Sequence, residues 1–220
     1  VNLKYISIWN VGDDSFDVDE GWRGKAQFLF LVQGYSLDAK QGSGVGDNCF
    51  ETDGAEDSDA QPVTTSVIYN ATVIGNPIDG DGGTVWRDNA RVQYRNCIFM
   101  DLGEKLVRPD GNDGDGANGY GHNGTLSFAD TWTTDYTVTS TVNDCIGCSV
   151  GDFNHNDTLY TVQTSGKLAE ITNSVFFRNL HADAYTDSDT VGVTVGGGSN
   201  PDKNNVVISG SDSANAPIVS

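Results

Sequence analysis

The chain has 220 residues, and its 31 acidic and 12 basic side chains give a formal charge of −19. This charge argues against a nucleic-acid partner, which needs a basic stripe on the protein, and against anionic membrane surfaces. No apolar run approaches the ~20 residues of a membrane helix, so we expect no membrane insertion. Asp accounts for 26 of the acids, and with 27 Gly the composition is too poor in helix formers for a helical bundle.

Short β-rich runs that end on Asn recur along the chain. They end at Asn10, Asn70, Asn96, Asn143 and Asn173, and the run FLFLVQ places Gln33 at an equivalent point. Asn tolerates the left-handed backbone of a fixed bend, and stacked Asn side chains can hydrogen-bond as a ladder. The spacing predicts a coil of about 23 residues with variable insertions.

A second repeat interleaves with the first. Residues 12–19 read GDDSFDVD and residues 46–53 read GDNCFETD, with looser copies at 82–90 and 104–111. The repeat predicts an inward row of Phe16, Phe50, Val85 and Leu106, and a column of acids formed by Asp19, Asp53, Asp88 and Asp110. Interleaved strand repeats are typical of a parallel β-helix, in which each coil adds one strand to each of two or three sheets.

We therefore expect an all-β solenoid, a parallel β-helix that forms a single domain over residues 1–220. Insertions at 36–47, 54–62, 75–83 and 110–131 are rich in Asp, Gly and Asn, and we expect them to form long acidic loops on one side. The chain opens directly on the strand-like sequence LKYISIW, which suggests a fragment of a longer secreted chain.

Outward positions of the second repeat are acidic. Because side chains alternate along a strand, an inward Phe16 leaves Asp17 and Asp19 facing outward. The next copy likewise leaves Glu51 and Asp53 outward, so stacking puts Asp17 beside Glu51 and Asp19 beside Asp53. Like charges in this arrangement repel one another. Bound calcium, an adjacent Arg or a raised carboxyl pKa is needed to offset the repulsion.

Calcium is the first candidate, because it takes ~6–8 oxygen ligands. Its expected ligands on the sheet are Asp17, Asp19, Glu51 and Asp53, and nearby loops supply further oxygens from Asp13, Asp14, Asp47, Asp79 and Asp81. The alternative is a solvated acidic surface without an ion.

The same face suits a catalytic interpretation. Asp17 and Glu51 are the candidate carboxylate pair of a glycosidase, in which one group acts as general acid with a raised pKa. Trp22 and Trp86 lie close to the acids in sequence and are candidates to contact sugar rings, although a buried Trp is the commoner arrangement.

With these repeats the sequence resembles the pectin-lyase-like superfamily of right-handed parallel β-helices, and residues 13–34 resemble secreted bacterial β-helix proteins without an assigned activity. GDDSF at 12–16 is similar to the GDD of polygalacturonases. The resemblance implies a right-handed helix, and it makes Arg87 and Arg108 candidate counterparts of the basic residues of pectate lyases.

Two classes of function follow. The first is an extracellular or cell-surface protein that binds polysaccharide, with calcium on its acidic face; cleavage by a hydrolase or lyase is a minority alternative. The second is a structural or adhesive subunit, a homo-oligomer that assembles into a filament through its open helix ends. The direction of Trp22 and Trp86 separates the two classes: toward a groove for the first, and toward the core or a subunit contact for the second.

Overall fold

The computed structural model describes thirteen stretches of the chain: 1–19, 21–34, 47–54, 64–76, 82–88, 90–103, 106–109, 131–135, 165–177, 179, 194–195, 198–199 and 206–208. These residues form β-strands joined into coils. No helix among them is long and apolar enough to cross a membrane.

The strands follow one another coil by coil. The first coil holds β1 (Leu3–Trp9) and β2 (Phe16–Val18), and the second holds β3 (Lys25–Val32) and β4 (Phe50–Asp53). The third holds β5 (Thr65–Tyr69), β6 (Thr72–Ile74) and β7 (Thr84–Arg87), and the fourth holds β8 (Arg91–Arg95), β9 (Ile98–Met100) and β10 (Val107–Pro109). Then come β11 (Glu170–Thr172), β12 (Val175–Phe177), β13 (Thr194–Val195), β14 (Gly198–Ser199) and β15 (Val206–Ile208).

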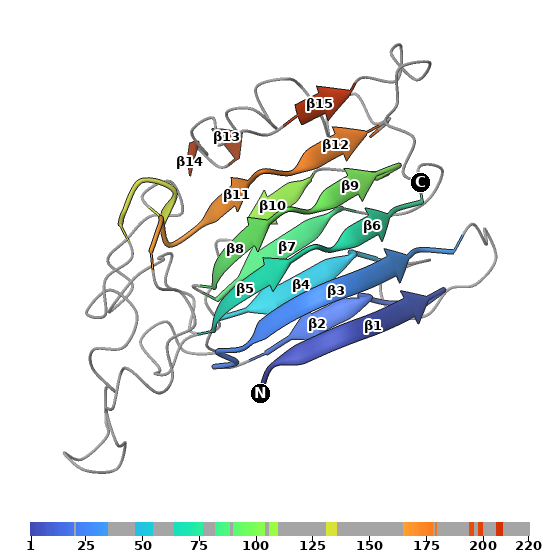
Figure 1. The fold of residues 1–220 in the computed structure, drawn as a ribbon, viewed down its shortest axis with the longest axis horizontal. Helices are drawn as coiled ribbons and strands as arrows, with labels where there is room; N and C mark the ends of the chain where they lie inside the picture. The colour runs from blue at the N-terminus through green and yellow to red at the C-terminus, as the bar shows by residue number, and fades with distance from the viewer. Residues whose placement is uncertain are drawn as a thin grey trace.

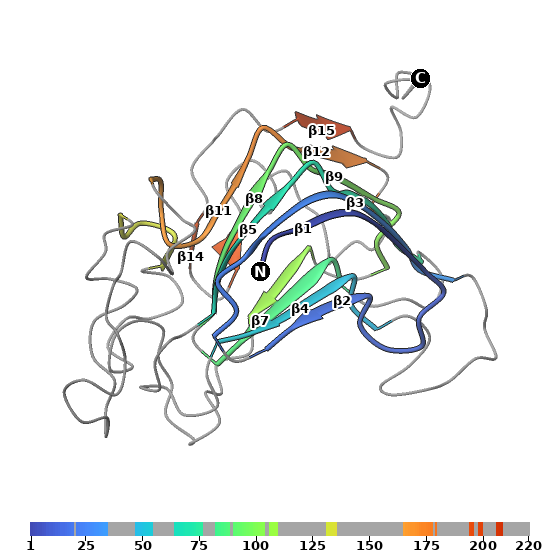
Figure 2. The same ribbon diagram turned by 60° about the horizontal axis from the view of Figure 1, so that its bottom comes forward.

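Equivalent strands of successive coils lie side by side (Figure 1). The large sheet has two halves, because β3 pairs with β5 through its first residues and with β6 through its last ones. We call the half with β5, β8 and β11 face 1, the half with β6, β9, β12 and β15 face 2, and the small sheet β2–β4–β7–β10 face 3. The long strands β1 and β3 bend from face 1 into face 2. Figure 2 shows the bent large sheet opposite the small one.

Every pairing in these two sheets is parallel, which confirms the predicted all-β parallel β-helix. The short strands β13 and β14 pair antiparallel beside it. Most of the predicted acidic loops lie outside the described residues, so their placement on one side stays a prediction.

The bend between faces 1 and 2 requires a left-handed residue in each coil. Asn70, Asn96 and Asn173 occupy it with φ of 53°, 57° and 52°, as the first repeat predicts. The first two coils place Tyr5 and Phe28 there instead, with φ of 59° and 61°. Their rings stack at a centroid distance of 5.1 Å. A search for Asn misses these two coils.

The sequence predicts that Asn10 and Gln33 lie at the same bend as Asn70, and this placement is wrong. The Asn10 N–H donates to the Val32 carbonyl at 3.0 Å, and the Gln33 N–H donates to the Ile74 carbonyl at 2.9 Å. Asn10 therefore has the left-handed φ of 54° at the far end of face 2, one bend later than Asn70. The two bends look alike in sequence because both follow a β-rich run.

Asn143 was expected to mark a coil between Asn96 and Asn173. That expectation is wrong, because β11 pairs directly with β8 and the Asn96 N–H donates to the Thr172 carbonyl at 3.0 Å. The two coils are therefore direct neighbours at this bend, and no further coil lies between them. Asn143 itself lies outside the described residues.

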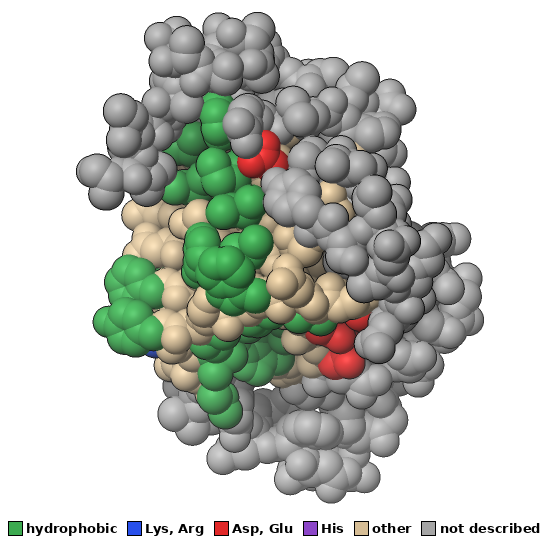
Figure 3. Space-filling model, turned by 90° about the vertical axis from the view of Figure 1, so that its right-hand side faces the viewer, with side chains coloured by type: hydrophobic (Ala, Val, Ile, Leu, Met, Phe, Trp, Pro, Cys, Tyr) green, Lys and Arg blue, Asp and Glu red, His purple; other side chains and the backbone are tan. Residues whose placement is uncertain are grey.

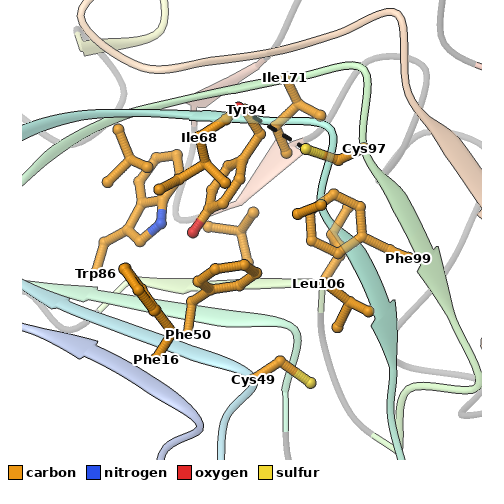
Figure 4. Packing of buried hydrophobic residues seen from close by; sticks show 14 of the residues in the cluster. Phe16, Cys49, Phe50, Ile68, Trp86, Tyr94, Cys97, Phe99, Leu106 and Ile171 are labelled. Atoms are coloured by element: carbon orange, nitrogen blue, oxygen red, sulfur yellow. Dashed lines mark hydrogen bonds between the residues drawn. The ribbon is translucent and has the colours of Figure 1, made fainter. Parts of the chain in front are cut away.

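Aromatic side chains fill the space between the three faces (Figure 4). Successive ring contacts of 5.8, 5.2, 5.6 and 5.6 Å join Phe16, Phe50, Tyr94, Phe99 and Phe176. The predicted stacking of Phe16 on Phe50 is confirmed.

The row does not continue as predicted from Phe50 to Val85. The register pairs Phe50 with Thr84 and Thr84 with Val107, so the third and fourth copies are shifted by one residue. The Thr84 hydroxyl lies 2.8 Å from the Tyr94 hydroxyl and accepts the Trp86 indole N–H at 2.9 Å, which satisfies these polar groups inside the core. Cys49 and Cys97 are buried free thiols in the same core.

The bend at Asn96 generates a stability prediction. Asn96 is exposed, so its main constraint is the left-handed backbone. We expect Asn96→Val to lower the free energy of unfolding by about 1–2 kcal/mol more than Asn96→Gly, because a β-branched residue is strained at positive φ. Urea unfolding measures the difference, and Lys4→Val on an exposed strand position is the control. Equal losses for Val and Gly at position 96 would contradict the assigned backbone.

Candidate functional site

Face 3 turns acidic side chains outward in its first two coils. Asp17 of β2 lies directly opposite Glu51 of β4, which confirms the predicted stacking of these two residues. Asp19 follows in line with Asp53, and its charge contributes to raising the Asp53 pKa. The four carboxylates therefore share one patch of the sheet.

Arg87 is the positive group of this patch. Its Nη1 donates to Glu51 Oε1 at 2.8 Å and lies 3.5 Å from Asp53 Oδ2. The register pairs Arg87 with Asp53, so Arg87 takes the place predicted for Asp88. Asp88 is shifted by one residue, is 4% exposed and has a left-handed φ of 48°. An adjacent Arg was one of the three expected means of offsetting the repulsion.

The loops that lead into β2 and β4 bring a second acidic group together. Single carboxylate oxygens of Asp13, Asp14 and Asp47 lie within 4.8 Å of one another. Asn48 joins them, because its backbone N–H and its side-chain amide both donate to Asp14 Oδ1 at 2.8 Å. The amide also donates to Asp47 Oδ1 at 3.3 Å. We call these four residues the loop cluster.

The loop cluster and the sheet patch are connected through Asp14 and Glu51. Burial, together with a side-chain hydrogen bond to Glu51, raises the pKa of Asp14 from its ordinary 3.8 to about 8 against the opposing hydrogen bonds from Asn48. Burial also raises the Asp53 pKa to about 8, with Glu51 adding to the shift and Arg87 opposing it. Partial burial of its carboxyl, followed by the charges of Asp19 and Glu51, raises the pKa of Asp17. With pKa values of about 8, the carboxyls of Asp14 and Asp53 keep their protons at neutral pH.

This arrangement has two chemical capacities. The loop cluster offers only oxygen ligands, which suits a hard cation such as calcium. Within the described residues Asn48 Oδ1 is buried without a hydrogen-bond partner. This oxygen can coordinate a cation. A carboxyl that stays protonated at neutral pH, as Asp14 does, can also serve as a general acid.

The two tryptophans proposed as sugar contacts lie elsewhere than expected. Trp86 is completely buried, and its indole stacks on Trp132 at 5.0 Å, so the prediction that it contacts a sugar is corrected. Trp22 is half-buried, packs on Phe16 at 6.1 Å and lies over Gly24, where no Cβ would fit. Both point toward the core.

The two Arg residues proposed as basic contacts lie on different strands. Arg87 is bound to its carboxylates, and Arg108 lies in β10 opposite Val85, one coil beyond the acidic patch. The side chain of Arg108 is outside the described part. The roles of Asp17, Asp19, Glu51 and Asp53 as ligands or catalytic groups stay predictions.

Sequence reasoning missed Asn48 and the contact between Asp14 and Glu51. The signal was present, because Gly-Asp-Asp at 12–14 and Gly-Asp-Asn at 46–48 are the same element one coil apart. Stacking the two copies puts Asp14 beside Asn48, as their hydrogen bonds show. Asp79 and Asp81 fall outside the described residues.

Comparison with known families identifies residues 1–175 as a pectate-lyase-like beta helix domain. The chain belongs to this family. No curated protein matches the chain, and no solved structure matches it. The family match spans all residues of the acidic patch and of the loop cluster, and it supports the resemblance to pectin-lyase-like β-helices.

The raised carboxyl pKa values predict how stability depends on pH. Between about pH 4 and pH 8 the folded state keeps the protons of Asp14 and Asp53, whereas the unfolded state has released them. Their contribution is therefore most favourable below about pH 4 and is lost as the pH rises through 8. We expect the melting temperature of Asp53→Asn to fall less between pH 5 and pH 8.5 than that of the parent.

Asp19→Asn is the matched control, because Asp19 is exposed and lies in line with Asp53 one coil earlier. Thermal melts at several pH values measure the three slopes. The assignment is contradicted if Asp53→Asn and Asp19→Asn show the same slope as the parent.

Proposed function

We propose that this protein is an extracellular or cell-surface β-helix that binds an acidic polysaccharide through calcium held at the loop cluster. The observation that carries the proposal is the convergence of Asp13, Asp14 and Asp47 beside the acidic patch of face 3. Membership of a pectate-lyase-like family supports a relation to polysaccharide.

The loop cluster fits calcium better than it fits a transition metal. Carboxylate and amide oxygens are its donors, and no His or Cys side chain belongs to it. Asp13, Asp14 and Asp47 would hold the ion, with Asp14 releasing its proton as the ion binds and with Asn48 Oδ1 as a further donor. Three carboxylates leave part of a shell of ~6–8 oxygens to water and to a bound ligand.

Because the chain is strongly negative, a bound cation is needed for it to bind an acidic glycan. A protein with a formal charge of −19 repels a polyanion, and the patch around Asp17 and Glu51 adds to this repulsion. Calcium supplies positive charge between the two partners. Arg87 fixes Glu51 and Asp53 in the patch, while Asp17 and Asp19 remain exposed to solvent.

The positions of the tryptophans favour the second class of function. With Trp86 in the core and Trp22 packed on Phe16, neither offers an exposed platform for a sugar. Tyr5 and Trp9 of β1 are instead 78% and 57% exposed at the first coil. A structural or adhesive subunit that assembles into a filament is the second candidate.

The calcium proposal is tested by thermal melts with calcium and with chelator. A ligand that binds only the folded state stabilises it by about 2.7 kcal/mol at a hundredfold excess over its Kd. For a chain of this size that corresponds to a rise of roughly 5–10 °C in melting temperature. We expect the double variant Asp13→Asn/Asp47→Asn to lose the rise, and we expect Asp135→Asn, an exposed residue outside the acidic patch and the loop cluster, to keep it. The same pattern is expected for binding of polygalacturonate measured by calorimetry in calcium.

Three results separate the alternatives. No calcium-dependent rise in the parent would contradict the ion site. A rise without glycan binding would contradict the polysaccharide proposal and leave a structural ion. Growth of the particle size in calcium would favour the assembling subunit.

A further inference from the structure

Face 2 carries an apolar surface on the outside of the helix. Trp9, Val32, Ile74 and Met100 lie in one outward column, because each pairs with the next across adjacent strands. Phe30 and Ile98 belong to the neighbouring outward column, together with Ser7 and Thr72. We call the apolar residues Trp9, Phe30, Val32, Ile74, Ile98 and Met100 the outer band.

The outer band is continuous across four coils. Trp9 is 57% exposed and meets Phe30 edge to face at 5.3 Å, and the other members are half-buried. Val175 of β12 extends the same face beside Ile98. Figure 3 shows the molecule from the side toward which the strands of face 2 point, and hydrophobic side chains gather there in one band.

The strands of face 2 are therefore apolar on both sides. Leu31, Val73 and Phe99 fill the core, while the residues on either side of each one face outward. Parallel strands that read as continuous hydrophobic runs are typical of sheets covered on both faces. The outward columns of the other faces are mixed: Gln27, Tyr69 and Arg95 share one column of face 1, and Asp17, Glu51 and Val85 share one column of face 3. Face 2 differs from them because its two outward columns carry no charged residue from β1 to β9.

We propose that the outer band is a docking surface for a second copy of this chain, packed side by side across a twofold axis. Charge supports this occupant: the whole chain carries −19, yet neither outward column from β1 to β9 contains a charged residue. Two copies can therefore meet along this band without opposing their acidic groups. A twofold axis places each column against its own equivalent, which is the condition for a self-complementary contact.

The dimensions of the band set the expected strength. Four strands about 4.8 Å apart and two columns of side chains make a surface on the order of 260 Å². A standard interface buries ~800 Å² on each partner, so the outer band supplies the apolar centre of a modest interface. We expect reversible pairing that strengthens with protein concentration and with salt, which screens the repulsion between the two acidic chains.

Sedimentation velocity of the full chain over about 1–200 µM tests the proposal. We expect the mass to rise with concentration from 23.4 kDa toward twice that value and to stop there. Ile74→Glu/Met100→Glu should remain at the monomer mass, because it places two carboxylates within the contact. The control Asn70→Asp/Asn96→Asp adds the same charge to the same coils at the bend, where Asp tolerates positive φ, and it should still dimerise.

Circular dichroism verifies that both variants keep the strand signal of the parent. The milder pair Ile74→Thr/Met100→Thr keeps β-forming side chains and should weaken pairing without adding charge. A parent that stays at 23.4 kDa throughout would overturn the proposal. It would also be overturned if the Glu variant dimerised as well as the parent, or if the mass grew beyond the dimer, which would indicate assembly through the helix ends.

Discussion

Parallel stacking of coils in fixed register is the constraint on which the rest of this structure depends. Because each coil lies directly above the last, a residue type at one position meets the equivalent position of its neighbours. Phe16 meets Phe50 inside the helix for this reason, and Asp17 meets Glu51 outside it. The core and the acidic patch are two sides of the same two strands, so neither can shift without the other.

Magnitudes show why the acidic patch persists. A buried aromatic side chain removes ~150–250 Å² from water, which at about 25 cal/mol per Å² is several kcal/mol for each ring. Like charges on adjacent strands cost only about 0.2–1 kcal/mol per pair. The ladder from Phe16 to Phe176 therefore sets the register, and the carboxylates must adapt. The repulsion between the carboxylates is reduced by the positive charge of Arg87 and by the protons that Asp14 and Asp53 keep.

The features that could be predicted from the sequence are those that the two most similar repeats share. The copies at 12–19 and 46–53 align without a gap and share Phe at the same position, so the inward Phe pair and the facing of Asp17 on Glu51 follow from them. The copy at 82–90 lacks the spacing of the others, and the one-residue shift that brings Arg87 in place of Asp88 is visible only in the strand pairing. Tyr5 and Phe28 hold a bend that residue preference assigns to Asn, because ring stacking and coil geometry override the local cost of positive φ. The burial of Trp86 depends on Trp132, which comes from a distant segment.

The central claim is that register forces the carboxylates together and that Arg87 compensates them. A double-mutant cycle with Arg87→Gln and Glu51→Gln measures this directly, with the free energy of unfolding taken from urea titration at neutral pH. We expect the two effects to be non-additive, with a coupling energy of about 1 kcal/mol, which is the upper range for partly exposed ion pairs. A coupling energy within error of zero would contradict the claim, because Arg87 and Glu51 would then act independently of each other.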